Sequence, residues 1–321
     1  MFRTAFRSAV LTFAVALAGA AHAQQPIAIG TSPAGTLTYS LATAYARVLL
    51  DTAQVQARVQ PTSGTTAMMP LVNNGDIDVA FVNTLEITEA YGGTGVFKGR
   101  PYQNVRMIGV LFPIKVGFFV RKDAPIRSIK DVRGKAVPYG YNTQEIIRTI
   151  TDGMLANGGM TAADVRPVLV PNVVRGADEF AGGRADVGFF ALGASKVKEV
   201  DAAVGGLRFI PMDDSPAALA AMQRIVPTSY LGTVMPSPAM TGVLEPIRTM
   251  FYDYVLFANA SVPKERIYQL TKAMAEQKQG LAEGFAQFRE LEPARMWRKF
   301  PVPYHEGAIQ YFNEKGITLV D

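Results

Sequence analysis

The sequence predicts a two-lobed α/β protein in which each lobe holds a mainly parallel sheet flanked by helices, with a cleft between the lobes. Three observations support this prediction. The 321 residues exceed what one hydrophobic core usually organises, strands and helices alternate, and a strand–helix–strand–helix–strand plan occurs twice. The composition, 49% hydrophobic and 18% charged, argues against disorder.

The first 23 residues have the features of a secretory signal peptide. Arg3 and Arg7 give a positive start, and Ala9–Ala20 is apolar but too short to span a bilayer. Ala21–Ala23 has the small-x-small form of a cleavage site. No cysteine is present for lipid attachment or disulfides. We therefore expect cleavage after about Ala23 and a mature periplasmic chain without direct membrane insertion.

The first strand–loop–helix unit spans Ile27–Leu50. The short apolar run Ile27–Gly30 predicts a strand, and apolar residues at helical spacing begin at Leu37. The start of such a helix offers unpaired backbone N–H groups and favours an anion. Thr36 alone would suit a simple helix cap, but the pattern recurs along the chain. The predicted ligand-binding residues of this loop are Thr31, Ser32, Gly35 and Thr36.

Two further strands complete this unit and also end in polar loops. Val55–Gln60 predicts a strand that Pro61 ends, a helix follows from about Thr65 to Val72, and Asp78–Val82 predicts a buried strand. The carboxyl ends of parallel strands meet at one edge of a sheet, so these loops are expected to join the first. Asp76 and Asp78 suit a turn better than a metal site. The predicted ligand-binding residues here are Ser63, Gly64, Thr65, Thr66 and Asn83.

The same plan recurs in Lys135–Ala191. Strands are predicted at 135–140, 165–170 and 186–190, and Gly75–Phe81 aligns with Gly183–Phe189. Aromatic side chains at strand ends suit either a pocket wall or the core, and both interpretations stay open for Tyr139 and Tyr141. The predicted ligand-binding residues of this half are Tyr139, Tyr141, Asn142, Thr143, Gln144 and Phe190.

The connections between the halves set the predicted boundaries. Two apolar strands, Met107–Phe112 and Val116–Arg121, are separated by Pro113, and the second is expected to cross between the lobes. Leu207–Pro211 is expected to form the return, and the apolar stretch Leu244–Phe257 suits either a helix or a strand. Lobe 1 is thus predicted at residues 24–117 and 212–321, and lobe 2 at residues 118–211.

Charge gives little reason to expect a nucleic-acid partner. The net charge of +5 falls to about +3 without the two leader arginines, and no such partner is predicted. Lys115, Arg148 and Arg175 lie near predicted cleft segments, where one could pair with a carboxylate, although a solvated surface position is favoured for each. No metal or other cofactor is predicted, because no phosphate-loop motif or His/Cys cluster occurs.

An enzyme is not expected from these residues. The sequence beyond the leader has one histidine, His305, and Ala34 stands where a nucleophile elbow needs glycine. Ser195 and Lys198 fit Ser-x-x-Lys, which leaves a periplasmic Ser/Lys hydrolase as the less favoured alternative.

Four segments together resemble the TAXI family, the solute receptors of tripartite ATP-independent periplasmic (TRAP) transporters. They are IGTSPAGTLTY, VQPTSGTTAMMPLVNNGDIDVAFVN, FFVRKDAPIRSIKDVRGKAV and PYHEGAIQYFNEKGI. The resemblance implies a type II-like periplasmic binding protein that delivers a small solute to the membrane subunits of a TRAP transporter. Known family ligands imply a small carboxylate, such as an amino acid like glutamate or an oxo or dicarboxylic acid.

One departure and one alternative accompany this resemblance. The loop Tyr139–Gln144 is poorer in Gly and Ser than is usual in the family, so the ligand is not carried over from a relative. Capture is expected to occur by closure of the lobes, with loop amides and hydroxyls holding the carboxylate. A sensor that presents its closed form to a membrane signalling partner would have the same sequence features. A monomer is the simplest assumption for either.

Overall fold

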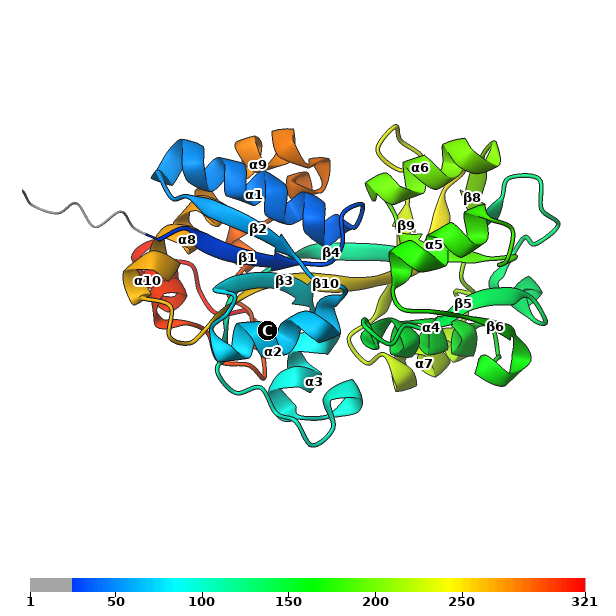
Figure 1. Ribbon diagram of the computed structural model, residues 1–321, viewed down its shortest axis with the longest axis horizontal. Helices are drawn as coiled ribbons and strands as arrows, with labels where there is room; N and C mark the ends of the chain where they lie inside the picture. The colour runs from blue at the N-terminus through cyan, green and yellow to red at the C-terminus, as the bar shows by residue number, and fades with distance from the viewer. Residues whose placement is uncertain (1–24, 321) are drawn as a thin grey trace, which may run out of the picture.

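The structure is a computed structural model, and it describes residues 25–320. The predicted signal peptide and its cleavage site lie outside the described residues. Figure 1 shows two lobes side by side, joined by the long strands β4 (Val105–Arg121) and β10 (Ile247–Asn259).

Lobe 1 begins with the predicted strand–helix–strand–helix–strand unit. β1 lies between β2 and β3, and both neighbours run parallel to it. The elements are β1 (Ile27–Thr31), α1 (Leu37–Ala53), β2 (Ala57–Pro61), α2 (Thr65–Asn74), β3 (Val79–Asn83) and α3 (Thr84–Gly92), followed by the short 3-10 helix η1 (Gly95–Phe97). All five residues of β1 and of β3 are buried, as apolar runs between two layers of helices require.

β10 lies at the centre of an eight-stranded sheet with the order β2-β1-β3-β10-β4-β7. It pairs antiparallel with both β3 and β4, so four of the five strands in lobe 1 run in one direction. In lobe 2, β4 also pairs with β7 (Gly188–Ala191) and β8 (Leu207–Phe209), and β10 pairs with β9 (Tyr230–Val234). The predicted α/β fold is confirmed, with two strands shared by both lobes.

The prediction of two strands separated by Pro113 is wrong, because β4 is continuous through this residue. Pro113 lies opposite Asp253, and the ladder shifts register between Asp253 and Val255. A register shift tolerates a residue that has no N–H to donate. Asp253 accepts a hydrogen bond from the Tyr230 hydroxyl at 3.1 Å and forms an ion pair with Arg298 at 2.6 Å. This irregular point lies within the two strands that join the lobes.

Lobe 2 repeats the plan of lobe 1 in β5-α4-β6-α5-β7. The elements before β7 are η2 (Ile129–Val132), β5 (Ala136–Gly140), α4 (Ile146–Asn157), η3 (Ala162–Asp164), β6 (Arg166–Val170) and α5 (Val173–Ala181). β5 and β6 form a separate parallel pair. Asp78 accepts a hydrogen bond from the Ala28 N–H at 2.7 Å, and Asp186 accepts the equivalent bond from Ala136 at 2.8 Å. The two aspartates therefore hold the same strand start in each lobe, as the sequence alignment predicted.

The chain between β7 and β10 stays in lobe 2, so the predicted return at Leu207–Pro211 is wrong. After α6 (Ser195–Val204), β8 pairs with β4 and α7 (Pro216–Ile225) packs against α4. β9 then pairs with the first part of β10, so residues 212–245 lie with lobe 2 and not with lobe 1. From here on, lobe 1 means the elements up to the first part of β4 and from the last part of β10 onward. Lobe 2 means those between.

The C-terminal elements cover lobe 1. They are α8 (Lys264–Glu276), α9 (Lys278–Gly284), η4 (Ala286–Glu290), η5 (Pro293–Arg295) and α10 (Glu306–Glu314). α1 packs against α8 and α9, and the buried Tyr45 hydroxyl of α1 donates to the carbonyl of Leu270 at 2.7 Å. In residues 25–320 no helix is long and apolar enough to cross a membrane.

Candidate binding cavity between the lobes

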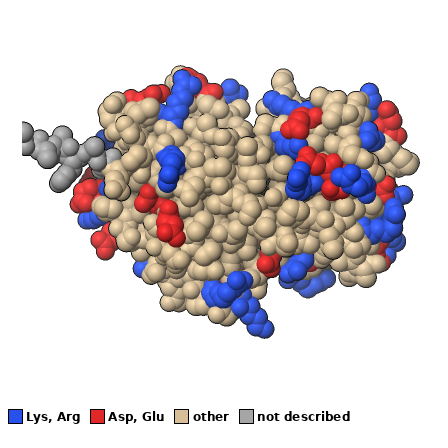
Figure 2. Space-filling view, in the orientation of Figure 1, with Lys and Arg blue, Asp and Glu red and all other residues tan. Residues whose placement is uncertain are grey.

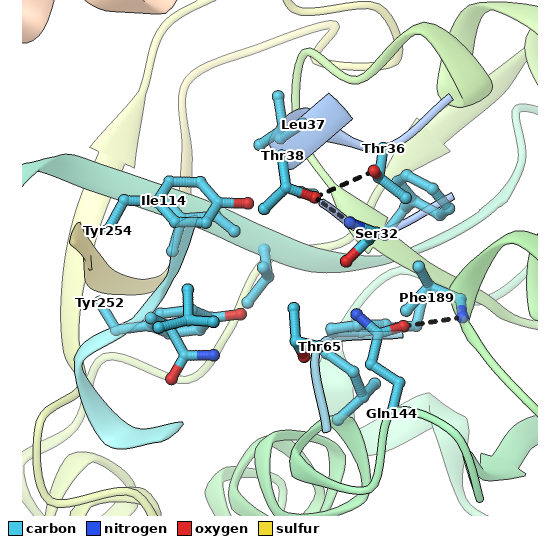
Figure 3. Close-up of a pocket in the computed structure, with 17 residues that line it drawn as sticks. Ser32, Thr36, Leu37, Thr38, Thr65, Ile114, Gln144, Phe189, Tyr252 and Tyr254 are labelled. Atoms are coloured by element: carbon cyan, nitrogen blue, oxygen red, sulfur yellow. Dashed lines mark hydrogen bonds between the residues drawn. The ribbon is translucent and has the colours of Figure 1, made fainter. Parts of the chain in front are cut away.

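A cavity of about 50 Å³ lies where the two lobes meet (Figure 3). At roughly 10–15 Å³ for each water-sized group, it holds only a few such groups. Its lining comes from both lobes and from the shared strands β4 and β10. The lining residues are Ser32, Thr36, Leu37, Thr38, Thr65, Val82, Asn83, Ile114, Val116, Gln144, Ile147, Val173, Phe189, Phe190, Ala191, Tyr252 and Tyr254.

Five helices begin at this cavity. Leu37, Thr65 and Val173 are the first residues of α1, α2 and α5. Asn83 is the N-cap of α3, and Ile147 lies in the first turn of α4. Each helix N-terminus carries a partial positive charge from its aligned peptide dipoles. Five of them around one small space make that space favourable for an anion.

The polar side chains of the lining belong to the turns that start these helices. Thr36 accepts a hydrogen bond from the Tyr39 N–H at 3.4 Å, and Thr38 Oγ1 accepts one from the Ser32 N–H at 3.3 Å. Gln144 Oε1 accepts from the Val173 N–H at 3.3 Å, and Figure 3 shows its amide nitrogen directed toward the cavity. One N–H at the start of α1 and one at the start of α5 are thus satisfied, and Gln144 retains donors for a ligand.

Two buried hydroxyls of the lining have no hydrogen-bond partner in the described structure. They are Ser32 Oγ and Thr65 Oγ1, on residues that are 1% and 4% exposed. A buried hydroxyl without a partner costs free energy unless a ligand supplies one. Figure 3 shows the hydroxyls of Tyr252 and Tyr254 directed into the same space. Burial raises the pKa of both tyrosines, so they remain protonated donors.

No charged side chain lines the cavity in the part of the chain that the structure describes. Lys115 is buried but forms an ion pair with Glu290. Arg148 lies 4.0 Å from Glu145, and Arg175 lies 3.2 Å from Asp178. On the face shown in Figure 2, the charged side chains gather over lobe 2 with both signs interspersed. The surface interpretation holds for Arg148 and Arg175, whereas Lys115 is a buried structural cation.

Comparison with known proteins assigns the family. A model of the NMT1-like family matches residues 29–316, which is most of the chain. This chain belongs to the NMT1-like family. Three solved structures share the fold of this NMT1-like protein at 10 to 12% sequence identity. At such identities the likeness shows the fold alone.

The first of these structures is PhnD1 from Prochlorococcus marinus in complex with methylphosphonate, with 11% identity and a TM-score of 0.55 over 91% of this chain and 98% of that one. The second is a periplasmic transporter, with 12% identity and a TM-score of 0.53 over 81% and 82%. The third is a histidine kinase sensor domain similar to periplasmic binding proteins, with 10% identity and a TM-score of 0.50 over 83% and 97%. The NMT1-like protein therefore has the two-lobed periplasmic binding protein fold.

The cavity brings together six of the residues that the sequence predicts as ligand-binding. They are Ser32, Thr36, Thr65, Asn83, Gln144 and Phe190. The other predicted residues lie outside the lining. They are Thr31, Gly35, Ser63, Gly64, Thr66, Tyr139, Tyr141, Asn142 and Thr143.

Several of these outer residues hold the lobes together. The carbonyl of Ser63 accepts hydrogen bonds at 3.0 Å from both Thr143 Oγ1 and Asn172 Nδ2. A Cβ added at Gly64 would lie 2.2 Å from the carbonyl oxygen of Thr143. We call Ser63, Gly64, Thr143 and Asn172 the clasp. None of these residues lines the cavity, and Asn172 is the N-cap of α5.

A second contact across the cleft involves Gly35. Its carbonyl accepts hydrogen bonds from the Lys196 N–H at 3.2 Å and from Ser195 Oγ at 3.4 Å. Gly35 has a φ of +91°, a conformation that glycine adopts readily. Ser195 thus contacts the opposite lobe, while Lys198 is exposed, and neither lines the cavity.

The remaining predicted residues contact protein groups behind the cavity. Tyr139 donates to Asp152 Oδ1 at 2.6 Å, and Tyr141 is fully buried and donates to the carbonyl of Pro138 at 2.9 Å. Thr31 donates to the carbonyl of Ser32 at 2.8 Å, whereas Thr66 donates to Glu86 at 3.2 Å. Asn142 is exposed. Residues from the predicted loops line the cavity, but a composition pattern does not show which side of a loop faces it.

Eleven lining residues were not among the predicted ones. They are Leu37, Thr38, Val82, Ile114, Val116, Ile147, Val173, Phe189, Ala191, Tyr252 and Tyr254. Tyr252 and Tyr254 had a usable signal, because alternate residues of a strand share a face. The segment Leu244–Phe257 would have to be recognised as a crossing strand for that signal to apply.

Proposed function

We propose that this NMT1-like protein is a periplasmic solute-binding receptor that captures a small carboxylate-bearing solute by lobe closure. The observation that carries the proposal is one small cavity that combines five helix N-termini with two unpartnered buried hydroxyls. Dipoles and hydroxyl donors both suit a carboxylate. The small volume favours the smaller amino acids and oxo acids over larger members of those classes.

The lining has a polar part and an apolar part, which match the two ends of the proposed solute. Ser32, Thr65 and Gln144 supply donors for carboxylate oxygens, and the tyrosine hydroxyls of β10 supply two more. Ile114, Val116 and Phe189 offer an apolar surface for the rest of the solute. Uncharged donors hold an anion without the desolvation cost of a buried ion pair, and this still allows release.

The positions of these donor groups require the two lobes to close around the solute. The donors come from both lobes, so they converge on one solute only when the lobes are together. A solute shifts the equilibrium toward the closed form only by binding it more strongly than the open form. Bending at the irregular pair Pro113 and Asp253 would separate the lobes and break the clasp contacts.

The partner that we propose is the membrane part of a TRAP-type secondary transporter. The support is the resemblance of four sequence segments to TAXI receptors. A membrane signalling protein that reads the same closed form is the alternative partner. Co-purification of the receptor with its permease, dependent on added solute, would test the transporter assignment.

A thermal-shift panel tests the proposed function. Residues 24–321, refolded to remove carried-over solute, are screened against amino acids, oxo acids, dicarboxylates and sugars. A solute at 100 times its dissociation constant adds about 2.7 kcal/mol of stability, which raises the melting temperature measurably. We expect shifts confined to small carboxylates. A shift confined to sugars, or no shift with any carboxylate, would contradict the proposal.

A further inference from the structure

A buried acid lies directly behind the cavity. Glu86 sits in the first turn of α3 and is fully buried. Asn83, which lines the cavity, donates from Nδ2 to Glu86 Oε2 at 3.4 Å and accepts from the Glu86 N–H at 2.8 Å. Thr66 donates to Oε1 at 3.2 Å. Glu86 is thus separated from the proposed solute by one layer of side chains.

No basic side chain pairs with Glu86 among the described residues. The ion pairs of residues 25–320 do not include it. The groups that face it are Thr65 and Thr66 from α2, Glu89 from its own helix, and Tyr252 and Tyr254 from β10. A carboxylate in such a place is costly to ionise, because burial removes water and no cation replaces it.

The proton affinity of Glu86 agrees with this geometry. Burial raises its pKa from 4.5 to about 8, the hydrogen bond from the Thr66 hydroxyl opposes the shift, and the nearby Glu89 adds to it. The charge of Glu86 also raises the pKa of Tyr252 and Tyr254, whose hydroxyls point into the cavity. The carboxyl group and the cavity therefore influence each other electrostatically.

Two negative charges in this region would oppose each other. The helix N-termini stabilise one anion in the cavity, and an ionised Glu86 would place a second beside it. Like charges in a poorly solvated site raise the pKa of the group that can take up a proton. An anionic solute should therefore bind best while Glu86 is protonated.

We propose that Glu86 couples solute binding to proton uptake, so that an anionic solute enters the cavity with up to one proton, which the Glu86 carboxyl group takes up wherever it is ionised in the solute-free protein. This inference rests on the proposed function, because it requires an anionic solute in the cavity.

Isothermal titration calorimetry with pyruvate, or with the carboxylate of largest thermal shift if that differs, tests the inference. Two buffers of different ionisation enthalpy, phosphate and Tris, report the protons taken up for each solute bound. For the wild-type protein we expect about half a proton at pH 8 and almost none at pH 6. The affinity should fall by up to tenfold for each pH unit above 8.

Two variants make the test specific. Glu86→Gln should bind without proton uptake and with an affinity that does not change between pH 6 and 9. The matched control is Glu89→Gln, which removes a half-buried acid of the same helix whose carboxylate accepts from the Val96 N–H at 3.2 Å. This control should still take up protons on binding, with a pH profile moved slightly downward because the charge of Glu89 no longer raises the pKa of Glu86. If Glu86→Gln does not fold, Thr66→Val serves instead, because losing that donor should move the pH profile upward.

The outcomes separate the two proposals. Solute binding without proton uptake, or with equal uptake in Glu86→Gln, would overturn the role of Glu86 and leave the receptor function standing. An unmoved profile in Thr66→Val would also count against it. If no carboxylate binds to the wild-type protein, the receptor proposal fails and the inference fails with it.

Discussion

The unpartnered hydroxyls of Ser32 and Thr65 belong either to a binding site or to a packing defect, and substituting them distinguishes the two. Ser32→Ala and Thr65→Ala should each weaken carboxylate binding by about 10- to 150-fold, because a hydrogen bond to a charged group contributes about 1.5–3 kcal/mol. The solute-free protein should keep its stability or gain slightly, since a buried unsatisfied group is removed. Titration calorimetry and thermal melting measure the two effects. The exposed Ser237→Ala is the control. Equal losses of affinity and stability would indicate a purely structural role.

Glu86 also makes folding stability depend on pH. Its pKa is raised from 4.5 to about 8 in the folded protein, so its contribution is fully present below pH 4.5 and is lost as pH rises toward 8. Glu86→Gln should therefore stabilise the protein by about 3 kcal/mol at pH 7 and by little at pH 4.5. Urea unfolding at both pH values measures this difference. The exposed Glu283→Gln should show no such trend, and a gain for Glu86→Gln that is independent of pH would contradict the prediction.

For single residues, the sequence predicted which loops carry polar side chains better than it predicted which of those side chains face the cavity. Ser32, Thr65 and Gln144, which line the cavity, were predicted as ligand-binding because polar residues follow strands at helix starts. Tyr139 and Tyr141 lie in the same kind of loop but contact the protein behind it. Which of two neighbouring side chains faces a cavity depends on backbone angles, such as the φ of +52° at Tyr141, that residue types alone do not specify.

The clasp between α2 and the loop before α4 gives a test of closure at the level of elements. Gly64 has a φ of 170°, which any residue adopts, but a Cβ there would lie 2.2 Å from the carbonyl oxygen of Thr143. Gly64→Ala should therefore fold normally and resist closure, which would weaken solute binding by more than 10-fold.

Solution scattering with and without solute measures this effect. Gly64→Ala should keep the larger radius of gyration after solute is added. Gly92→Ala is the control, because its added Cβ meets only the Thr94 side chain at 3.7 Å. Normal affinity in Gly64→Ala would show that the clasp does not limit closure.

The helices and outer strands could be predicted because their patterns are local. α1 has one buried face and Thr36 at its N-cap, and the repeated Asp78 and Asp186 marked equivalent strands. The two shared strands could not be predicted in the same way. Twelve of the 17 residues of β4 lie in the two apolar stretches predicted on either side of Pro113, and the path of β10 depends on pairing with strands that are distant in sequence.

For the whole molecule, solute should change the distance between the lobes. The sequence has no cysteine, so spin labels attach only at introduced sites. Labels at Thr43→Cys on α1 and Lys198→Cys on α6 span the cleft (Figure 1). Double electron–electron resonance should show a longer distance without solute and a shorter one with a binding carboxylate.

The control pair, Thr43→Cys with Lys272→Cys, lies within lobe 1 and should show one unchanged distance. If the labelled protein still binds solute but the distance between the labels on α1 and α6 does not change, capture by closure is ruled out.

The central position of β10 has a consequence for biosynthesis. Val105, the first residue of β4, pairs with Asn259, the last residue of β10. A nascent chain that has already made β3 and β4 must hold their edges unpaired until most of the polypeptide has been translated. Such delayed, non-local pairing slows folding and exposes strand edges to aggregation. A chain stopped before β10 should thus be an insoluble fragment, and the two lobes should melt in a single transition.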